Sequence, residues 1–345
     1  MASTPSSPPT EDAARRLRWA HGDAELHAFG GMLAPVRFRA AGRADFSPLH
    51  VAPWADDPQA HQQWPGLLGR LRGEWPCVPF GRCDRPDGLP GTWQARQPAD
   101  DWAHGYASHH RWQWLASDAL SLALHIEMPP GHPVQRLTRT VRAVADAPAL
   151  EITLQIDARK PCRLPVALHP TLRLDLGRVA LDLHHDGPGF AYPVPTEPGR
   201  SRLAPGARFE QLGAVPLADG STGGPTGDFA HFPQPADGED LLQLMDVVGP
   251  VTARYLDAGW SLTLDWDRAL LPDLMLWVSH RGRLAPPWNG RHLALGVEPV
   301  NGAWDLGRIG RPPADHPLAV RDGIALHPDE PCVIRHRLAA RPLNP

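Results

Sequence analysis

Strict alternation of apolar and polar residues is the feature that most limits how this chain can fold. Residues 120–126, 150–156 and 260–266 each place mainly Leu, Ile or Trp on one face and polar side chains on the other, which is the period of a half-buried strand. Residues 134–144 and 172–176 extend the set. Helical periodicity is weak, and 41 prolines and 32 glycines separate short apolar runs. The pattern predicts an all-β protein of antiparallel strands, arranged as a sandwich or a barrel.

The length of 345 residues suits one large β domain or two ordinary ones, and the even composition favours one. We expect a disordered Ser/Pro-rich tail over residues 1–15 and a single domain over residues 16–345. Residues 193–239 are dense in Pro, Gly, Asp and Ser, and they are too many for an ordinary turn between strands. A functional loop and a surface insertion without a role both remain open for that stretch.

Composition and charge exclude several classes of partner. The formal net charge is -4 and no Lys/Arg cluster interrupts the chain, which argues against nucleic acid as a partner. No apolar run approaches the roughly 18 residues of a membrane span, and residues 1–12 lack the apolar stretch of a signal peptide. The four cysteines have no CxxC spacing, so the local sequence indicates neither a zinc site nor a redox-active cysteine pair. We therefore expect a cytoplasmic chain with free thiols and no membrane partner.

Three short signatures far apart in the chain carry the candidate chemistry. They are His104-Gly105-Tyr106-Ala107, His169-Pro170 and Gly296-Val297-Glu298-Pro299. Together they supply two imidazoles and one carboxylate in strand-rich surroundings. Opening the ring of a hemiacetal sugar needs a base for the anomeric hydroxyl and an acid for the ring oxygen. A carboxylate and a histidine suit these roles, because each titrates near neutral pH after a modest shift.

Each candidate also has an ordinary structural explanation. Pro170 forces His169 toward an extended backbone and ends or bends its strand, which presents the side chain to a cleft. Taken by itself, a histidine at a strand end is more often a satisfied structural residue. Glu298 ends an apolar run, where burial would raise the pKa of its carboxyl; a salt bridge with an arginine is the alternative. His184-His185-Asp186 is a poor ligand set because neighbours on a strand point to opposite faces, so we expect no metal.

The chain resembles a known superfamily at these same residues. Leu71-Arg72-Gly73-Glu74-Trp75-Pro76-Cys77-Val78-Pro79-Phe80-Gly81, His104-Gly105-Tyr106-Ala107 with Trp112, Leu168-His169-Pro170, and residues 271–277 followed by 296–299 stand in a consistent order over roughly residues 20–340. In this order they resemble the motifs of the aldose 1-epimerase, or galactose mutarotase-like, superfamily. The resemblance is strongest to its branch of hexose-6-phosphate mutarotases.

The resemblance implies both a fold and a set of roles. The fold would be a large antiparallel β-sandwich of the supersandwich type, with a cleft on one sheet open to sugars. Glu298 would be the general base at the C1 hydroxyl and His169 the general acid at the ring oxygen, while His104 would hold and polarise the sugar. Further substrate-binding candidates are Arg72, Asp246 and Trp277. No cofactor is implied, and we expect a small-molecule sugar as partner of a monomer or homodimer.

Three departures from the pattern of the phosphosugar branch bear on the substrate. Ser108 stands where an arginine is typical, Glu74 replaces a glycine and adds negative charge near the site of a phosphate, and Thr171-Leu172 replaces an aromatic pair. Recognition of a 6-phosphate is therefore left open. Two other functions remain beside mutarotation of a free aldose: a non-catalytic sugar-binding or regulatory protein, and a carbohydrate-cleaving enzyme with Glu298 and Asp246 as its two carboxylates.

Overall fold

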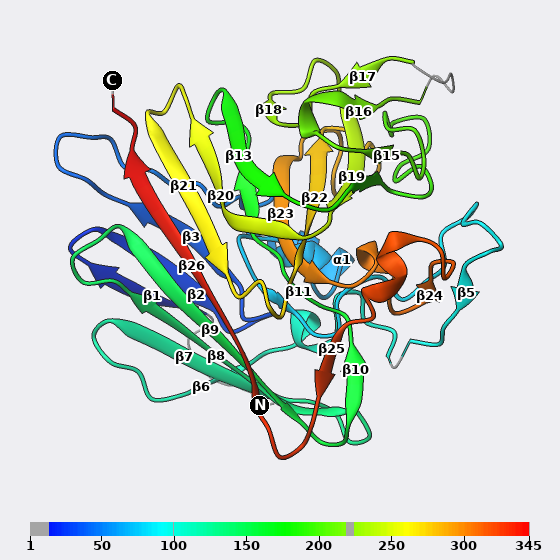
Figure 1. The fold of residues 1–345 in the computed structure, drawn as a ribbon. Helices are drawn as coiled ribbons and strands as arrows, with labels where there is room; N and C mark the ends of the chain where they lie inside the picture. The colour runs from blue at the N-terminus through cyan, green and yellow to red at the C-terminus, as the bar shows by residue number, and fades with distance from the viewer. Residues whose placement is uncertain (1–13, 99, 219–223, 345) are drawn as a thin grey trace, which may run out of the picture.

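Two large antiparallel sheets packed face to face make up most of the molecule (Figure 1). The computed structural model describes residues 14–98, 100–218 and 224–344. The alternating segments expected at 120–126, 150–156 and 260–266 correspond to strands β7 (Ser121–Glu127), β9 (Ala149–Ala158) and β21 (Trp260–Trp266). These strands and the two sheets confirm the predicted all-β class. Alternation of this kind buries one face of a strand and leaves the other face polar.

Each large sheet combines strands from both halves of the chain. In spatial order, the nine-stranded sheet runs β18 (His231–Phe232), β13 (Val179–His185), β20 (Val247–Tyr255), β21 (Trp260–Trp266), β26 (Cys332–Pro342), β9 (Ala149–Ala158), β8 (Val134–Ala143), β7 (Ser121–Glu127) and β6 (Gln113–Trp114). The eight-stranded sheet runs β15 (Arg208–Phe209), β14 (Gly189–Ala191), β19 (Gly238–Leu244), β22 (Asp273–His280), β23 (Leu293–Asn301), β11 (Val166–Leu168) and β4 (Pro76–Cys77), with β12 (Thr171–Arg173) also paired to β23.

The remaining elements are short. A three-stranded sheet contains β1 (Ala14–Trp19), β2 (Gly22–His27) and β3 (Leu33–Phe38), and three two-stranded ribbons pair β10 (Cys162–Leu164) with β25 (Ile324–Leu326), β16 (Val215–Pro216) with β17 (Thr226–Gly227), and β24 (Gly310–Arg311) with β5 (Gln94–Ala95). The helical elements are α1 (Pro58–Gln63) and 3₁₀ turns at Leu68–Arg70, Tyr106–His109, Leu212–Ala214, Trp304–Leu306 and Pro317–Val320.

Apolar side chains of the two large sheets meet between them. Leu154 and Leu264 of the nine-stranded sheet belong to one buried cluster with Leu276 and Leu295 of the eight-stranded sheet. The opposite face of the eight-stranded sheet carries a second buried cluster, which includes Trp277 and is covered by loops. Because strand side chains alternate, β22 and β23 contribute one set of residues to each cluster, and both of their faces are buried. This second cluster surrounds the cavity described below.

The long polar stretch at 193–239 is partly ordered into short strands. Within it, β15 extends the eight-stranded sheet through β14, and β18 extends the nine-stranded sheet through β13. The stretch therefore joins the edges of both sheets, on the upper right in Figure 1. It is a structural part of the sandwich margin, a role that the sequence alone left open.

The N-terminal expectation requires a small correction. The tail was expected to reach residue 15, but β1 begins at Ala14 and pairs with β2 from that residue onward. Residues 1–13, the rest of the predicted tail, lie outside the described residues. In the part of the chain that the structure describes, no helix has the length and apolar character needed to cross a membrane.

Glu74 does not add charge to a ligand cleft as its replacement of a glycine suggested. Its side chain is fully buried between the sheets, where Arg139 of β8 forms an ion pair with it and His336 Nε2 of β26 lies 3.4 Å from its second carboxylate oxygen. Burial opposes ionisation of Glu74, but the charges of Arg139 and His336 outweigh it and lower its pKa to about 2. Glu74 thus ties the N-terminal segment to the nine-stranded sheet.

Candidate active site

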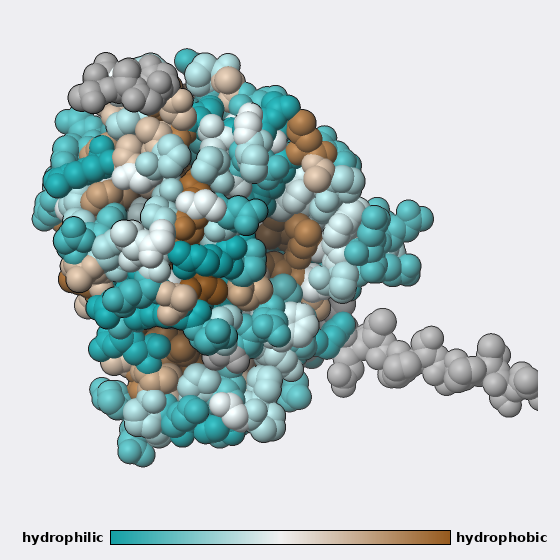
Figure 2. Space-filling model, turned by 90° about the vertical axis from the view of Figure 1, so that its right-hand side faces the viewer, coloured by the Kyte–Doolittle hydropathy of each residue, from teal (hydrophilic) through white to brown (hydrophobic). Residues whose placement is uncertain are grey.

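A cavity of about 320 Å³ lies against the second buried cluster, on the face of the eight-stranded sheet that turns away from the core. Its walls are largely apolar, and its polar groups come from segments far apart in the chain; the lining residues that matter below are His104, His169, Trp75, Trp277, Trp288, Arg283, Glu298 and Asp305. Seen from the side that lies on the right in Figure 1, the molecular surface is hollowed and hydrophobic residues are visible in the hollow (Figure 2). A mainly apolar pocket with a few convergent polar groups is typical of a small-molecule site.

Glu298 and His169 meet in this cavity. Glu298 Oε1 lies 3.4 Å from His169 Nε2, and the two side chains are 0% and 6% exposed. Neither oxygen of the Glu298 carboxyl makes a regular hydrogen bond within the described residues. Burying a carboxyl without hydrogen-bond donors costs free energy, and groups of this kind cluster at functional sites. The salt bridge to arginine that was the ordinary explanation for Glu298 is therefore not what the structure shows.

The local sequence explains how the pair forms. β11 and β12 both pair with β23, and the break between them falls at His169-Pro170. The imidazole is thereby set beside Glu298, as expected for a strand interrupted before a proline. On β23, a Cβ on Gly296 would lie 2.3 Å from Glu298 Oε1, so the glycine of the Gly296-Val297-Glu298-Pro299 signature leaves the space that the carboxyl occupies.

Burial shifts both members of the pair toward their neutral forms. The pKa of Glu298 is raised well above its ordinary value, chiefly by burial and further by the charge of Asp305. The pKa of His169 is lowered well below its ordinary value, chiefly by burial and further by His104. With one proton between them the two groups form a neutral pair, which both shifts favour. Transfer of that proton to His169 gives an ion pair whose charges compensate each other.

His169 is held from several sides. Its ring stacks on Trp75 with centroids 4.0 Å apart, and its Nδ1 lies 3.3 Å from the hydroxyl of Thr171. Contact with Thr171 at Nδ1 leaves Nε2 for Glu298 and a ligand. Thr171, which replaces an aromatic residue of the family pattern, therefore supports the imidazole.

His104 lies at the same site. Its ring is 5.3 Å from that of His169, and burial lowers its pKa to about 3, so it acts as a neutral donor or acceptor. Gly105 has a φ of 86° and a Cβ there would lie 2.4 Å from Val78 O, so this turn requires glycine. Ser108, where the family pattern has arginine, is fully buried and donates to His104 O at 2.8 Å. It closes the turn and supplies no cation.

Two predicted binding residues are not brought to the cavity. Arg72 is among the buried residues, but its guanidinium donates to Ala55 O at 2.6 Å and to Asp56 Oδ1 at 2.7 Å, and it does not line the cavity. Asp246 lies in the turn between β19 and β20, with a φ of 53°, and forms an ion pair with Arg321. Its side chain is 51% exposed outside the cavity, so the structure gives neither residue a place in the site.

Several cavity residues were not predicted from the sequence. Asp305 lies in the 3₁₀ turn Trp304–Leu306 and accepts a hydrogen bond of 2.7 Å from Tyr192. Burial raises its pKa, although the charge of Arg82 opposes this. Arg283 enters from the loop between β22 and β23. Asp305 could have been suspected as a cavity residue only because it follows Glu298 closely, in a segment that contains a tryptophan. Nothing in the local sequence marked Arg283.

Comparison with known proteins identifies the type of fold. No family model matches the chain, and no curated protein matches it. Among solved structures it is similar to a protein from Escherichia coli K12 assigned provisionally as an aldose 1-epimerase, with 17% identity, a TM-score of 0.64, and coverage of 96% of this chain and 99% of that one.

Two further solved structures agree. A GalM/aldose epimerase homologue from C. elegans is 14% identical with a TM-score of 0.60 and covers 96% and 99% of the two chains. A galactose mutarotase-like protein from Lactobacillus casei is 12% identical with a TM-score of 0.57 and covers 95% and 100%. The chain therefore has the galactose mutarotase-like β-sandwich fold over nearly its whole length. The resemblance predicted from the motifs is confirmed at the level of fold.

Proposed function

We propose that this protein is an aldose 1-epimerase, which interconverts the α and β anomers of a free aldose. The observation that carries the proposal is the contact between the Glu298 carboxyl and His169 Nε2 at 3.4 Å in a cavity walled by tryptophan. Indole faces suit the apolar faces of a pyranose ring. The buried carboxyl without protein hydrogen-bond donors is suited to accept a proton from a bound hydroxyl group.

The proposed cycle conserves protons and electrons. With the shared proton on His169, the Glu298 carboxylate takes the proton of the C1 hydroxyl. The C1–O5 bond breaks with its electron pair on O5, which receives the proton from His169 Nε2, and an open-chain aldehyde results. After rotation about C1–C2, O5 attacks the other face of C1, His169 takes back the O5 proton, and Glu298 returns its proton to the carbonyl oxygen.

Neighbouring groups support these proton transfers. Stacking on Trp75 and contact with Thr171 fix the imidazole of His169. Burial gives Glu298 a raised pKa, which makes its carboxylate a stronger base once it is ionised. His104 supplies a neutral imidazole that can bind a sugar hydroxyl beside the reacting atoms.

The test is anomer exchange in matched variants. We expect Glu298→Gln and His169→Ala each to slow conversion of α- to β-glucose or galactose by about 10²- to 10⁴-fold, the usual contribution of one acid or base. Rates are followed by polarimetry and exchange NMR. The control is Glu151→Gln, an exposed carboxylate of β9 on the opposite sheet, which should keep the wild-type rate.

The same assay separates the alternatives. Wild-type exchange rates in both site variants would contradict the proposed roles. If the wild-type protein binds sugar, as followed by tryptophan fluorescence, but gives no exchange above background, the protein is a sugar-binding module. The cleaving reaction pictured with Glu298 and Asp246 loses its support, because Asp246 lies outside the cavity in an ion pair with Arg321.

A further inference from the structure

The cavity contains a fixed cation that the acid–base chemistry does not use. Arg283 lies in the loop between β22 and β23, and its side chain is 28% exposed. Among the described residues that line the cavity, it is the only arginine or lysine. A guanidinium stays charged at every physiological pH and offers several N–H donors in a planar fork.

Arg283 is held in place by three contacts. Its Nε lies 2.9 Å from Glu239 Oε1. Its guanidinium carbon lies 4.6 Å from the ring centre of Trp288 and 5.5 Å from that of Trp277. Cation–π contacts with two indoles restrict the plane of the guanidinium. The ion pair uses Nε, so the terminal nitrogens at the far end of the fork are available to a ligand.

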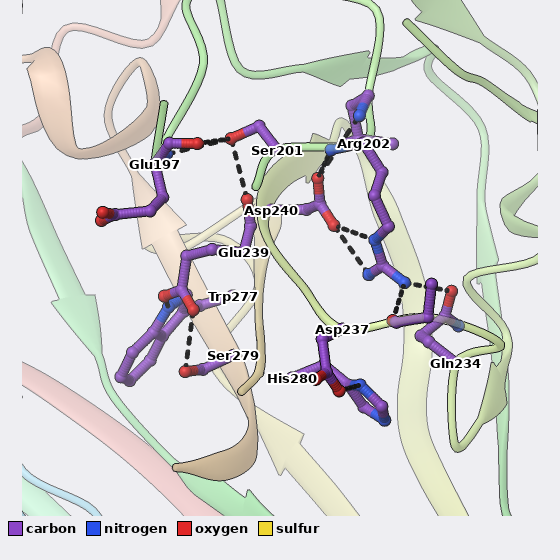
Figure 3. A network of polar contacts seen from close by, with 12 residues as sticks. Glu197, Ser201, Arg202, Gln234, Asp237, Glu239, Asp240, Trp277, Ser279 and His280 are labelled. Carbon is purple, nitrogen blue, oxygen red and sulfur yellow. Dashed lines mark hydrogen bonds and ion pairs between the residues drawn. The ribbon is translucent and has the colours of Figure 1, made fainter. Parts of the chain in front are cut away.

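Glu239 is the centre of this arrangement. It belongs to β19 and is fully buried, and its carboxylate accepts hydrogen bonds from Trp277 Nε1 at 2.6 Å and Ser279 Oγ at 3.0 Å (Figure 3). Ser279 in turn contacts His292 Nδ1 at 2.8 Å. One buried carboxylate thus fixes both an indole wall and the cation. Burying a charge is expensive unless several donors satisfy it, and here two of the partners of Glu239, Trp277 and Arg283, line the cavity.

The charge balance of the cavity indicates what Arg283 binds. Glu239 offsets the charge of Arg283, and two further carboxyls, Glu298 and Asp305, line the same space. A phosphate dianion would meet one cation that Glu239 already compensates, and it would further oppose the ionisation of Glu298 that the proposed reaction needs. Neutral hydroxyl groups need only N–H donors at the right spacing, and the fork of a guanidinium provides them.

We propose that Arg283 is a specificity-determining residue that donates hydrogen bonds to two adjacent hydroxyl oxygens of an uncharged sugar, with Glu239 as its positioning residue. The proposal rests on the proposed function for the identity of the ligand. It assigns to this loop the selection among sugars, while Glu298 and His169 carry out the proton transfers.

The experiment uses two readouts on the full chain. Binding is measured by the fluorescence of the tryptophans in the cavity wall, and turnover is measured by polarimetry. The sugars are glucose, galactose, their singly deoxygenated analogues and glucose 6-phosphate. The variants are Arg283→Met, Arg283→Lys and Glu239→Gln. The matched control is Arg281→Met in the same loop, because Arg281 is 46% exposed and lines a different depression.

We expect Arg283→Met to raise Kd and KM for the best sugar about 10- to 100-fold, since hydrogen bonds to charged groups contribute about 1.5–3 kcal/mol, and to change kcat less than about threefold. Arg283→Lys keeps the charge but loses the fork, so it should recover only part of the affinity. Glu239→Gln should raise KM in the same direction, and Arg281→Met should match the wild type.

The deoxygenated sugars make the test specific. Removal of a hydroxyl that Arg283 binds should weaken binding to the wild-type protein but cause no further loss in Arg283→Met. The proposal is overturned if Arg283→Met keeps wild-type Kd values, if every deoxygenated sugar loses the same factor in both proteins, or if the wild type prefers glucose 6-phosphate. Absence of exchange with intact Arg283-dependent binding would instead contradict the proposed function alone.

Discussion

At the scale of single residues, burial decides the protonation state of the Glu298 carboxyl. Its folded-state pKa is raised, so the fold stabilises the protonated form. The buried carboxyl therefore lowers the free energy of unfolding only at pH values above its ordinary pKa of 4.5, where the same group ionises in the unfolded chain. His169 does not offset this cost, because burial also disfavours its charged form.

The raised pKa predicts a trade-off between stability and activity at Glu298. Relative to the wild type, Glu298→Gln should unfold at higher urea concentration at pH 8, because glutamine has no ionised form to bury. The difference should shrink as pH falls toward 4, where the wild-type carboxyl is protonated in both states. Urea melts of both proteins at several pH values test this. A difference that stays constant with pH would contradict the raised pKa of Glu298.

At the scale of elements, β19 connects the cavity to the margin of the sandwich. Glu239 and Asp240 are neighbours on this strand and point to opposite sides, Glu239 toward Trp277 and Asp240 toward Arg202 (Figure 3). Asp240 is buried and accepts hydrogen bonds from both the backbone N–H and the side chain of Arg202. This contact fastens the excursion at 193–239 to the eight-stranded sheet.

Asp240→Asn should therefore loosen that excursion. We expect a loss of roughly 1.5–3 kcal/mol, typical of hydrogen bonds to a charged group, and faster hydrogen exchange in the excursion than in β22 or β23. The control is Glu210→Gln, which removes a largely exposed partner of Arg208 in the same excursion and should cost less than about 1 kcal/mol. Unchanged exchange in Asp240→Asn would show that other contacts anchor the excursion.

At the scale of the whole molecule, the ion pair between Glu74 and Arg139 bridges the N-terminal segment and the nine-stranded sheet. The pKa of Glu74 is lowered to about 2 from 4.5, as Arg139 and His336 outweigh the effect of burial. A carboxyl whose folded-state pKa is depressed contributes stability above its unfolded pKa and loses it as pH falls through the folded value. Stability should thus decline between about pH 4.5 and 2.

Arg139→Met should destabilise the protein by about 3–5 kcal/mol at neutral pH, because it leaves the buried Glu74 carboxylate without its main partner. The double variant Glu74→Gln/Arg139→Met should recover part of the loss. Arg136→Met is the matched control, since its pair with Glu127 on the same sheet is about half exposed. Urea unfolding measures these variants, the single variant Glu74→Gln and the wild type, and additive losses in the double variant would contradict a coupled pair.

Much of the architecture follows from local patterns in the sequence. The alternation in residues 120–126, 150–156 and 260–266 predicted three strands that the structure contains. The proline after His169 predicted the strand interruption there, and the apolar run before Glu298 predicted a buried carboxyl. These features are local, since a period of two residues or a proline constrains the backbone wherever the segment is placed.

The contacts that the candidate site residues make could not be predicted from local sequence patterns. Arg72 and Asp246 were substrate-binding candidates that the resemblance implied, yet ion pairs with Asp56 and Arg321 hold them outside the cavity. Glu74 was expected near a ligand, yet it faces the core. In each case an ion pair with a residue distant in sequence or on another loop decided the orientation of a side chain. Such pairings depend on which strands become neighbours, which no local period specifies.

The amino-acid sequence by itself determined the class of fold, the faces of the main strands, and the presence of one carboxyl and two imidazoles in strand-rich surroundings. Only the tertiary structure decided that Glu298 meets His169, that Asp305 shares their cavity, and that Glu239 holds Arg283 against Trp288. The physical reason is the range of the interactions involved. Backbone preference and side-chain alternation act over a few residues, whereas a cavity is created by contacts among segments that only the folded sheets bring together.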